Sequence, residues 1–267
     1  MARASVNGVS IEYEVHGCGE PLLVVPAFSF SKNSWKNQIP ALSKDFRVII
    51  LSQRGHGDSG MPQGDENYAP SAFVSDLHGL LETLNIRERV IIIGHSMGAR
   101  VTMQYCLDHP ERVRTAILVT PMTGSKPAGP AAGLFQDDRI REMEKLGWSG
   151  FLDKYAKLWF APGAAAEFIK ASTVDNYKIP DHAVISMVKM GLKNDLADRL
   201  SALKTPVLVL AGENDQRIPV EEQEKVNRLL ANSWLKIIKG AGHMPQLENP
   251  RDLAGAILDF LSMVRRN

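Results

Sequence analysis

One serine of this chain lies in a sequence pattern that prepares a hydroxyl group for nucleophilic attack. Ser96 is the centre of the pentapeptide 94–98 (Gly-His-Ser-Met-Gly), which follows the apolar run 90–93 and precedes a helical pattern. A G-x-S-x-G pentapeptide between a strand and a helix is typical of a nucleophile elbow, a strained turn that exposes the serine Oγ. The start of the helix also provides unpaired N–H groups where an oxyanion would form. The pattern therefore predicts that Ser96 is a nucleophile.

A serine hydroxyl is a weak nucleophile at neutral pH, so it needs a general base, and the base needs a carboxylate that orients it. His243 is the favoured base because it lies in the loop 240–245, directly after the apolar run 235–238. His95 is adjacent to Ser96 in sequence, but an elbow turn directs neighbouring side chains away from each other. The carboxyl ends of parallel strands open onto one crevice, which is where we expect His243 to meet Ser96.

The orienting carboxylate should follow a strand in the same way. Asp215 does so, in the loop 211–219 after the apolar run 207–210, and Glu213 is its rival. Asp215 is the preferred candidate. The chain order is then serine, acid and histidine, which is the order of α/β-hydrolases and differs from the orders on the chymotrypsin and subtilisin folds.

The elements that must position these residues are short β-branched runs that alternate with helical patterns. The runs are continuous, as expected for strands covered on both faces of a parallel sheet, and they lie at 22–25, 48–51, 90–93, 116–119, 206–210 and 235–238. An Asn7-Gly8 turn signal predicts a hairpin over 6–15. Helical spacing occupies 71–84, 100–107, 220–230 and 253–264. The alternation predicts an α/β fold with a mostly parallel, doubly wound sheet.

One long segment interrupts the alternation. Between the runs at 116–119 and 206–210 the patterns are helical, at 137–146, 150–160, 164–172 and 182–203, and glycines and prolines open the segment. We therefore expect a catalytic core made of residues 1–124 and 205–267 and a helical cap made of 125–204. Aromatic side chains of the cap, among them Phe135, Trp148 and Trp159, either pack onto the core or line part of a pocket.

With these motifs the sequence resembles the α/β-hydrolase superfamily, and in particular its small esterase/lactonase-like members with a helical cap. The resemblance covers essentially the whole chain. The segment 53–59 (Gln-Arg-Gly-His-Gly-Asp-Ser) looks like the family's R-G-x-G-x-S loop, and 212–219 and 242–243 resemble its acid and histidine loops. The resemblance implies that Arg54 and His56 brace a loop and take no part in catalysis.

The predicted oxyanion hole departs from the family pattern. In most relatives the strand corresponding to 22–25 leads into His-Gly, and the next residue gives an oxyanion N–H; here Pro26-Ala27 precedes Phe28. By position, the amides of Phe28 and Met97 should form the hole. Ala27 lacks the backbone freedom of glycine, so this departure bears on the geometry of the hole and not on that of the three catalytic candidates. Ser29 and Ser31 either add a hydroxyl donor or cap the loop.

The predicted function is a serine hydrolase that cleaves a small carboxylic ester or lactone through an acyl-enzyme, with no metal and no organic cofactor. A serine at the elbow argues against haloalkane dehalogenases and epoxide hydrolases, because those relatives use an aspartate there. The same site leaves carbon–carbon bond hydrolysis, thioester hydrolysis and cofactor-free perhydrolysis open. A hydrolase-like ligand receptor with slow turnover is the alternative from another class, since some signalling relatives also deviate at the Pro26-Ala27 position.

Composition limits the partners. The 267 residues include 31 Lys and Arg against 30 Asp and Glu, a formal charge of +1, which argues against nucleic-acid binding and a polybasic membrane contact. Two cysteines, Cys18 and Cys106, cannot form a disulfide framework, and no apolar stretch suits a signal peptide or a transmembrane helix. We therefore expect a cytoplasmic protein that acts on a small, largely apolar substrate, with an oligomeric state that the sequence does not reveal.

Overall fold

The computed structural model describes residues 2–124, 137–191 and 195–266. Within these ranges eight strands form one sheet in the order β1-β2-β4-β3-β5-β6-β7-β8. Pairing is antiparallel between β1 and β2 and between β2 and β4, and parallel everywhere else. The strands are β1 (Ala2–Val6), β2 (Val9–His16), β3 (Glu20–Val25), β4 (Phe46–Leu51), β5 (Val90–His95), β6 (Val113–Val119), β7 (Val207–Gly212) and β8 (Ser233–Ile238). The predicted α/β class with a mostly parallel sheet is confirmed.

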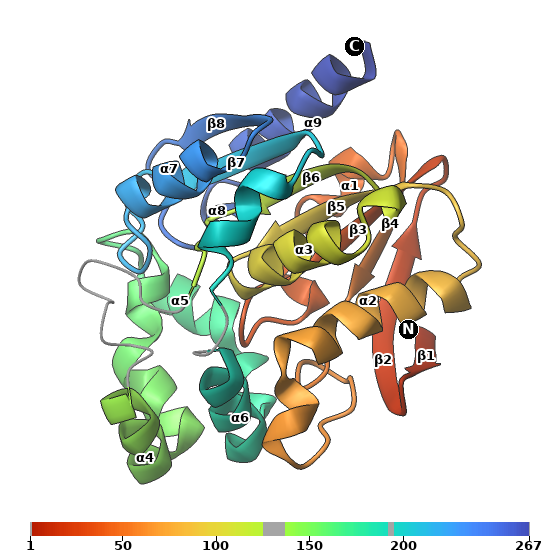
Figure 1. Ribbon diagram of the computed structural model, residues 1–267. Coiled ribbons are helices and arrows are strands. Elements are labelled where there is room, and N and C mark those ends of the chain that lie inside the picture. Colours follow the sequence, from red (N-terminus) through yellow and green to blue (C-terminus); the bar gives the residue numbers. More distant parts are fainter. Residues whose placement is uncertain (1, 125–136, 192–194, 267) are drawn as a thin grey trace.

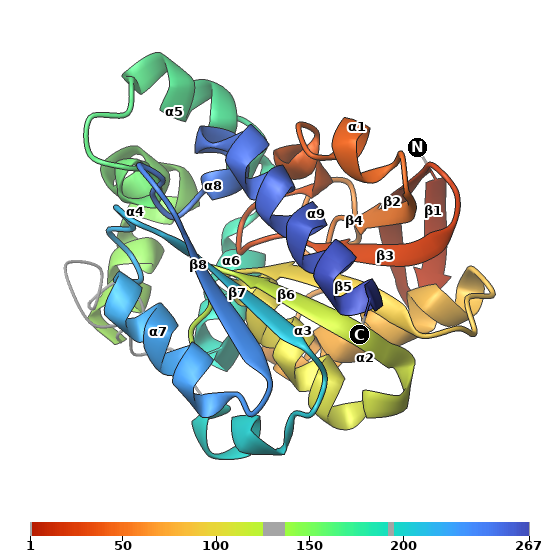
Figure 2. The ribbon, with the colours of Figure 1, turned by 90° about the horizontal axis from the view of Figure 1, so that it is seen from above.

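Helices connect the strands and cover both faces of the sheet (Figures 1 and 2). The α-helices are α1 (Ile39–Leu42), α2 (Pro70–Thr83), α3 (Met97–Asp108), α4 (Asp137–Tyr155), α5 (Ala166–Thr173), α6 (Asp181–Gly191), α7 (Val220–Leu229), α8 (Pro245–Glu248) and α9 (Pro250–Arg266). Short 3₁₀ helices are η1 (Lys32–Trp35), η2 (Asp65–Tyr68), η3 (Pro110–Arg112), η4 (Ala156–Trp159), η5 (Asn176–Lys178) and η6 (Ala197–Ala202).

The continuous apolar runs supply side chains to both faces of the sheet. Along β3, Leu23 and Val25 belong to a core shared with α2, α3 and α7, whereas Leu22 and Val24 belong to a core shared with α1 and α9. Successive side chains of a strand point to opposite faces, so a strand covered on both sides must be apolar at every position. Figure 2 shows α9 crossing one face of the sheet, with α2 and α3 on the other.

The sheet topology determines where a site can form. β3 lies between β4 and β5. The connection from β3 therefore leads to β4 on one side of it, and the chain later crosses over to form β5 on the other side. In open α/β sheets a crevice forms beyond the carboxyl ends of the strands at such a switch point. The segment after β3 and the first turn of α3 meet there, because a Cβ on Gly98 would lie 2.2 Å from the Val25 carbonyl oxygen.

Every described element between β6 and β7 is a helix, and we call this segment the helical insertion. Figure 1 shows α4 and α6 at the bottom of the view, with α5 above α4. The expected break near 147–149 is present, because Gly147 has a φ of 68° inside α4. A single helical segment over 182–203 is wrong: α6 ends at Gly191 and η6 begins at Ala197. The glycine- and proline-rich stretch 125–136, including Phe135, lies outside the described residues.

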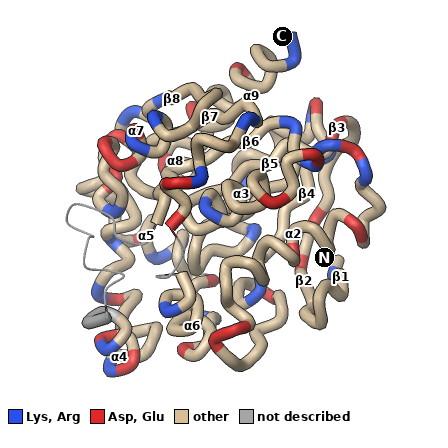
Figure 3. Tube along the Cα trace, in the orientation of Figure 1, with Lys and Arg blue, Asp and Glu red and all other residues tan. Residues whose placement is uncertain are grey.

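Surface charge and helix composition bear on the partners. Acidic and basic residues of the described chain are interspersed along the elements (Figure 3). Among the described helices, none combines the length and the apolar character needed to cross a membrane. Cys106 is buried and Cys18 is exposed, and both are free thiols.

Candidate active site

Ser96 lies on a strained turn between β5 and α3. Its φ of 53° and ψ of −111° are outside the usual regions for a residue with a side chain. Both flanking glycines are required, since a Cβ on Gly94 would lie 2.4 Å from the Gly98 carbonyl oxygen, and a Cβ on Gly98 would meet the end of β3. The Ser96 N–H donates to the Val119 carbonyl over 2.9 Å. The turn is therefore fixed by the neighbouring strands, and Ser96 keeps its side chain at the carboxyl edge of the sheet.

The side chains of Ser96, His243 and Asp215 form a continuous hydrogen-bonded chain. The His243 Nε2 lies 2.9 Å from the Ser96 Oγ, and its Nδ1 lies 2.7 Å from an Asp215 carboxylate oxygen. Because a carboxylate only accepts, Nδ1 carries the proton and Nε2 is left to accept from the serine hydroxyl. All three residues are at most 9% exposed. The structure thus brings together the three residues that the sequence indicated.

The Asp215 carboxylate is held by more than the histidine. Its Oδ1 accepts from the backbone N–H groups of Arg217 and Ile218 at 2.8 and 2.9 Å, and Gln223 lies 3.4 Å from Oδ2. The rival Glu213 lies elsewhere, because its carboxylate accepts from the Gly240 N–H at 2.8 Å in an exposed contact. The geometry therefore agrees with the preference for Asp215 over Glu213.

Two residues that the sequence did not indicate hold the His243 loop. The His95 Nε2 donates to the His243 carbonyl over 2.8 Å. Glu248 accepts from the Gly242 and Met244 N–H groups at 2.9 and 3.2 Å, on either side of His243. Burial is the largest influence on the Glu248 carboxyl and raises its pKa, against the three backbone N–H groups that lower it. The only sequence signal for His95 was its place in the elbow, and Glu248 had none.

The Glu248 carboxylate also reaches the helical insertion. Its Oε1 accepts from the Ala161 N–H over 2.6 Å. At the same place a Cβ on Gly242 would lie 2.3 Å from the Ala161 nitrogen. One carboxylate therefore connects the histidine loop to the backbone that follows η4, and a side chain at position 242 would push these two segments apart.

The segment after β3 carries the predicted oxyanion residue Phe28. The expected difficulty at Ala27 is absent: positive φ occurs at Ser29 (65°), and Ala27 has none. The Ser29 N–H donates to the His56 Nε2 over 2.9 Å, which stabilises that turn. Met97, the other predicted donor, is the first residue of α3, and its N–H has no acceptor within the helix.

Arg54 and His56 brace the loop after β4. The Arg54 guanidinium makes a buried bidentate contact with Asp76, at 2.7 and 2.6 Å. The His56 Nδ1 donates to the Arg54 carbonyl over 2.9 Å. Burial lowers the pKa of His56 from 6.5 to about 4, so the ring is neutral at neutral pH and its Nε2 can accept from Ser29.

This neutral histidine should make the fold sensitive to acid. The unfolded chain takes up the His56 proton near pH 6.5, whereas the folded chain does so only near pH 4. The contribution to stability is therefore complete above pH 6.5 and is lost as the pH falls towards 4. We expect His56 alone to lower the free energy of unfolding by about 2 kcal/mol between pH 7 and pH 5. Burial also lowers the pKa of His95, which acts in the same direction.

Urea unfolding at both pH values measures this effect. The His56→Gln variant should be less stable at pH 7 but should lose less stability on acidification. An equal loss in the variant and the natural sequence would contradict the assignment to His56.

The helical insertion packs directly onto these loops. The rings of Trp148 and Phe28 meet edge to face at 5.7 Å between centroids. Asn176 donates to the Ser29 Oγ over 3.0 Å, and the Arg217 guanidinium lies 5.2 Å from the centre of the Trp159 ring. The site therefore lies where the insertion meets the carboxyl edge of the sheet. No group of three or more His, Cys, Asp or Glu side chains in the described ranges is placed to hold a metal ion.

Comparison with known proteins agrees with this architecture. Residues 20–250 match the family model described as the alpha/beta hydrolase fold. A 2-hydroxy-6-oxo-6-(2'-aminophenyl)hexa-2,4-dienoic acid hydrolase from Metapseudomonas resinovorans is 28% identical over 283 residues, covering 97% of this chain and 89% of that protein. A thermophilic esterase from Thermogutta terrifontis, in a malate-bound structure, is 27% identical with a TM-score of 0.88 over 98% of each chain.

An enol-lactonase from Burkholderia xenovorans LB400 has the same fold. Its structure gives a TM-score of 0.87 at 22% identity, covering 98% of this chain and 100% of that chain. The chain belongs to the α/β-hydrolase fold family. The family and the names of its relatives together support hydrolase activity.

Proposed function

We propose that the protein is a serine hydrolase that cleaves a small carboxylic ester or lactone by acyl transfer. The observation that carries this proposal is the buried chain of contacts from the Ser96 Oγ through His243 to Asp215. A hydroxyl on a strained elbow, a neutral imidazole that accepts its proton and a carboxylate that fixes the tautomer are the parts that acyl transfer needs.

The reaction proceeds in two steps. The Ser96 Oγ attacks the carbonyl carbon while the His243 Nε2 takes its proton, and the tetrahedral intermediate collapses when His243 donates that proton to the leaving oxygen. Water then attacks the acyl-enzyme with His243 again as the base, and the acid is released with a free Ser96 hydroxyl. Asp215 stabilises the imidazolium formed in each step and stays ionised.

Two backbone N–H groups bind the oxyanion in this mechanism. Met97 contributes the first amide of α3, where the helix dipole adds positive potential. Phe28 contributes the amide before the Ser29 turn, and the Ser29–His56 hydrogen bond supports its position. Amides held in this way need no reorganisation when charge develops, which is the basis of their contribution to the rate.

The proposed substrate site lies between two parts of the chain. We assign residues 1–124 and 205–267 to a catalytic core and 125–204 to a cap. The contacts of Trp148 with Phe28 and of Asn176 with Ser29 support this division, since they join the insertion to the edge of the sheet at the site. A small molecule bound there would lie against both parts.

Hydrolysis of a carbon–carbon bond is the second candidate. The relative from Metapseudomonas resinovorans is named as a dienoic acid hydrolase, whereas the structural relatives are named as an esterase and an enol-lactonase. The same nucleophile and base serve these reactions and also thioester hydrolysis and perhydrolysis. Which bond is cleaved therefore depends on the pocket and not on the hydrogen bonds between Ser96, His243 and Asp215.

Two measurements test the proposal together. Labelling by a fluorophosphonate should modify Ser96, and p-nitrophenyl esters, lactones, thioesters and vinylogous diketones should be compared under multiple turnover. Labelling with turnover of esters or lactones supports the proposal. Turnover of the diketones alone identifies a carbon–carbon hydrolase, and labelling without turnover of any substrate identifies a ligand receptor.

A further inference from the structure

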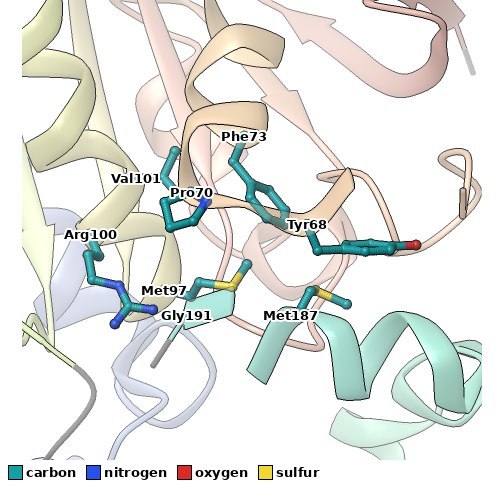
Figure 4. Close-up of a pocket in the computed structure, with 8 residues that line it drawn as sticks. All are labelled: Tyr68, Pro70, Phe73, Met97, Arg100, Val101, Met187 and Gly191. Atoms are coloured by element: carbon teal, nitrogen blue, oxygen red, sulfur yellow. The ribbon is translucent and has the colours of Figure 1, made fainter. Parts of the chain in front are cut away.

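A pocket lies beside the elbow, between α3 and the helical insertion (Figure 4). It is narrow, since the space that the centre of a water molecule can reach in it is about 20 Å³. Met97, Arg100 and Val101 contribute from one face of α3, because residues three and four apart on a helix lie side by side. The opposite walls include Phe73 of α2 and Met187 of α6. Apart from Arg100, the side chains named here are apolar.

Arg100 is the unusual member of this pocket. Its guanidinium forms no hydrogen bond and no ion pair with any residue in the described ranges. Asp195 acts on it electrostatically and raises its pKa, against burial, which is the larger influence and lowers it. A guanidinium has five N–H donors, and leaving them without acceptors in a partly buried, apolar setting is costly. Burial lowers the pKa of Arg100 to about 10, so the side chain stays charged at neutral pH.

The position of Arg100 relates it to the nucleophile. Its backbone N–H donates to the Ser96 carbonyl over 3.2 Å, so it lies one helical turn after the elbow. Side chains of a helix lean towards its N-terminus, which here is the turn that carries Ser96 and Met97. Gly191, the last residue of α6, allows the guanidinium to approach, since a Cβ there would lie 2.9 Å from its Nη2.

We propose that Arg100 binds a carboxylate of the substrate, so that the preferred esters or lactones carry a free carboxylate separated from the scissile carbonyl by a short hydrocarbon chain. A planar guanidinium pairs with a carboxylate through two parallel hydrogen bonds, which favours this anion. The apolar walls formed by Phe73, Val101 and Met187 suit the hydrocarbon between the two groups. This inference rests on the proposed function, because it defines the substrate class of the same site.

Matched substrates separate charge recognition from catalysis. The value of kcat/KM is measured for mono-p-nitrophenyl glutarate and for its neutral methyl ester, with the natural sequence and with Arg100→Gln and Arg100→Lys. We expect Arg100→Gln to lower kcat/KM for the acid about 10- to 100-fold and to change the value for the neutral ester by less than about 3-fold. Arg100→Lys should be intermediate, because it keeps the charge but loses the paired geometry.

Arg199→Gln is the control for lost positive charge. Arg199 is half-exposed and pairs with Asp108, and it does not line the pocket. This variant should have the same kcat/KM as the natural sequence for both esters. If Arg100→Gln lowers kcat/KM equally for the acid and the neutral ester, or does not lower it for the acid, the inference is overturned and the proposed function is left intact.

Binding of glutarate can be measured even if no ester is turned over. Glutarate is titrated calorimetrically into Ser96→Ala and into the double variant Ser96→Ala/Arg100→Gln. Heat of binding in the first that is lost in the second supports the carboxylate site even where the proposed function fails. No binding of glutarate to the first, together with no preference for the acid ester, would contradict the inference.

Discussion

Replacement of Ser96 by alanine is expected to reduce turnover of every substrate by at least about 10⁴-fold and to abolish fluorophosphonate labelling. The Ser96 Oγ is the atom that forms the acyl bond in the proposed mechanism, and the structure offers His243 no other hydroxyl at hydrogen-bond distance among the described residues. Any rate that remains above that of the uncatalysed reaction in water would come only from the oxyanion donors and from substrate binding.

The fold should survive this substitution. The Ser96 side chain makes no capping hydrogen bond to α3, so the change removes only the contact with His243, at a cost of about 1 kcal/mol. Thermal unfolding followed by circular dichroism tests the fold, and Ser262→Ala on α9 is the matched control for activity. Retained turnover in a folded Ser96→Ala protein would refute the assignment of the nucleophile.

Replacement of Asp215 by asparagine is expected to lower kcat by about 10³- to 10⁴-fold. The Arg217 and Ile218 N–H groups both donate to Oδ1, so the asparagine must place its oxygen there and present its NH₂ group to the imidazole. The His243 Nδ1 then has to accept, and its proton moves to Nε2. In that tautomer the ring cannot accept the proton of Ser96.

Glu213→Gln is the control for this experiment. Its carboxylate contacts the Gly240 N–H in an exposed position, and the glutamine oxygen can accept the same hydrogen bond. We expect less than about a 3-fold change in kcat, within the range of an exposed polar substitution. A larger loss in Glu213→Gln than in Asp215→Asn would reverse the assignment of the acid.

The strands and the elbow were predictable because local sequence encodes them. A run such as 90–93 is apolar at every position, as a strand covered on both faces requires. The glycines of the pentapeptide are where any side chain would collide with α3 or β3. The single helix expected over 182–203 was wrong because apolar spacing continues to Leu203, although residues 195 and 196 lie outside any helix and η6 follows them.

The backbone turn after β3 depends on a residue that is distant in the sequence. The sequence pattern places the need for backbone freedom at Ala27, but the positive φ belongs to Ser29. The residue that stabilises this turn is His56, 27 positions further along the chain. Only the folded structure brings that imidazole, kept neutral by burial, to the Ser29 N–H.

Sequence patterns were enough to predict the fold class and the three residues proposed for catalysis, because the turn, the strand ends and the chain order are local or sequential properties. It favoured Asp215 over Glu213 without excluding the latter, and it gave no indication of Glu248 or Arg100. Those were decided by tertiary structure, since hydrogen bonding and burial depend on segments far apart in the chain. Glu248 joins the His243 loop to Ala161, and the apolar setting of Arg100, with no hydrogen bond or ion pair to another described residue, depends on α2, α3 and α6 lying together.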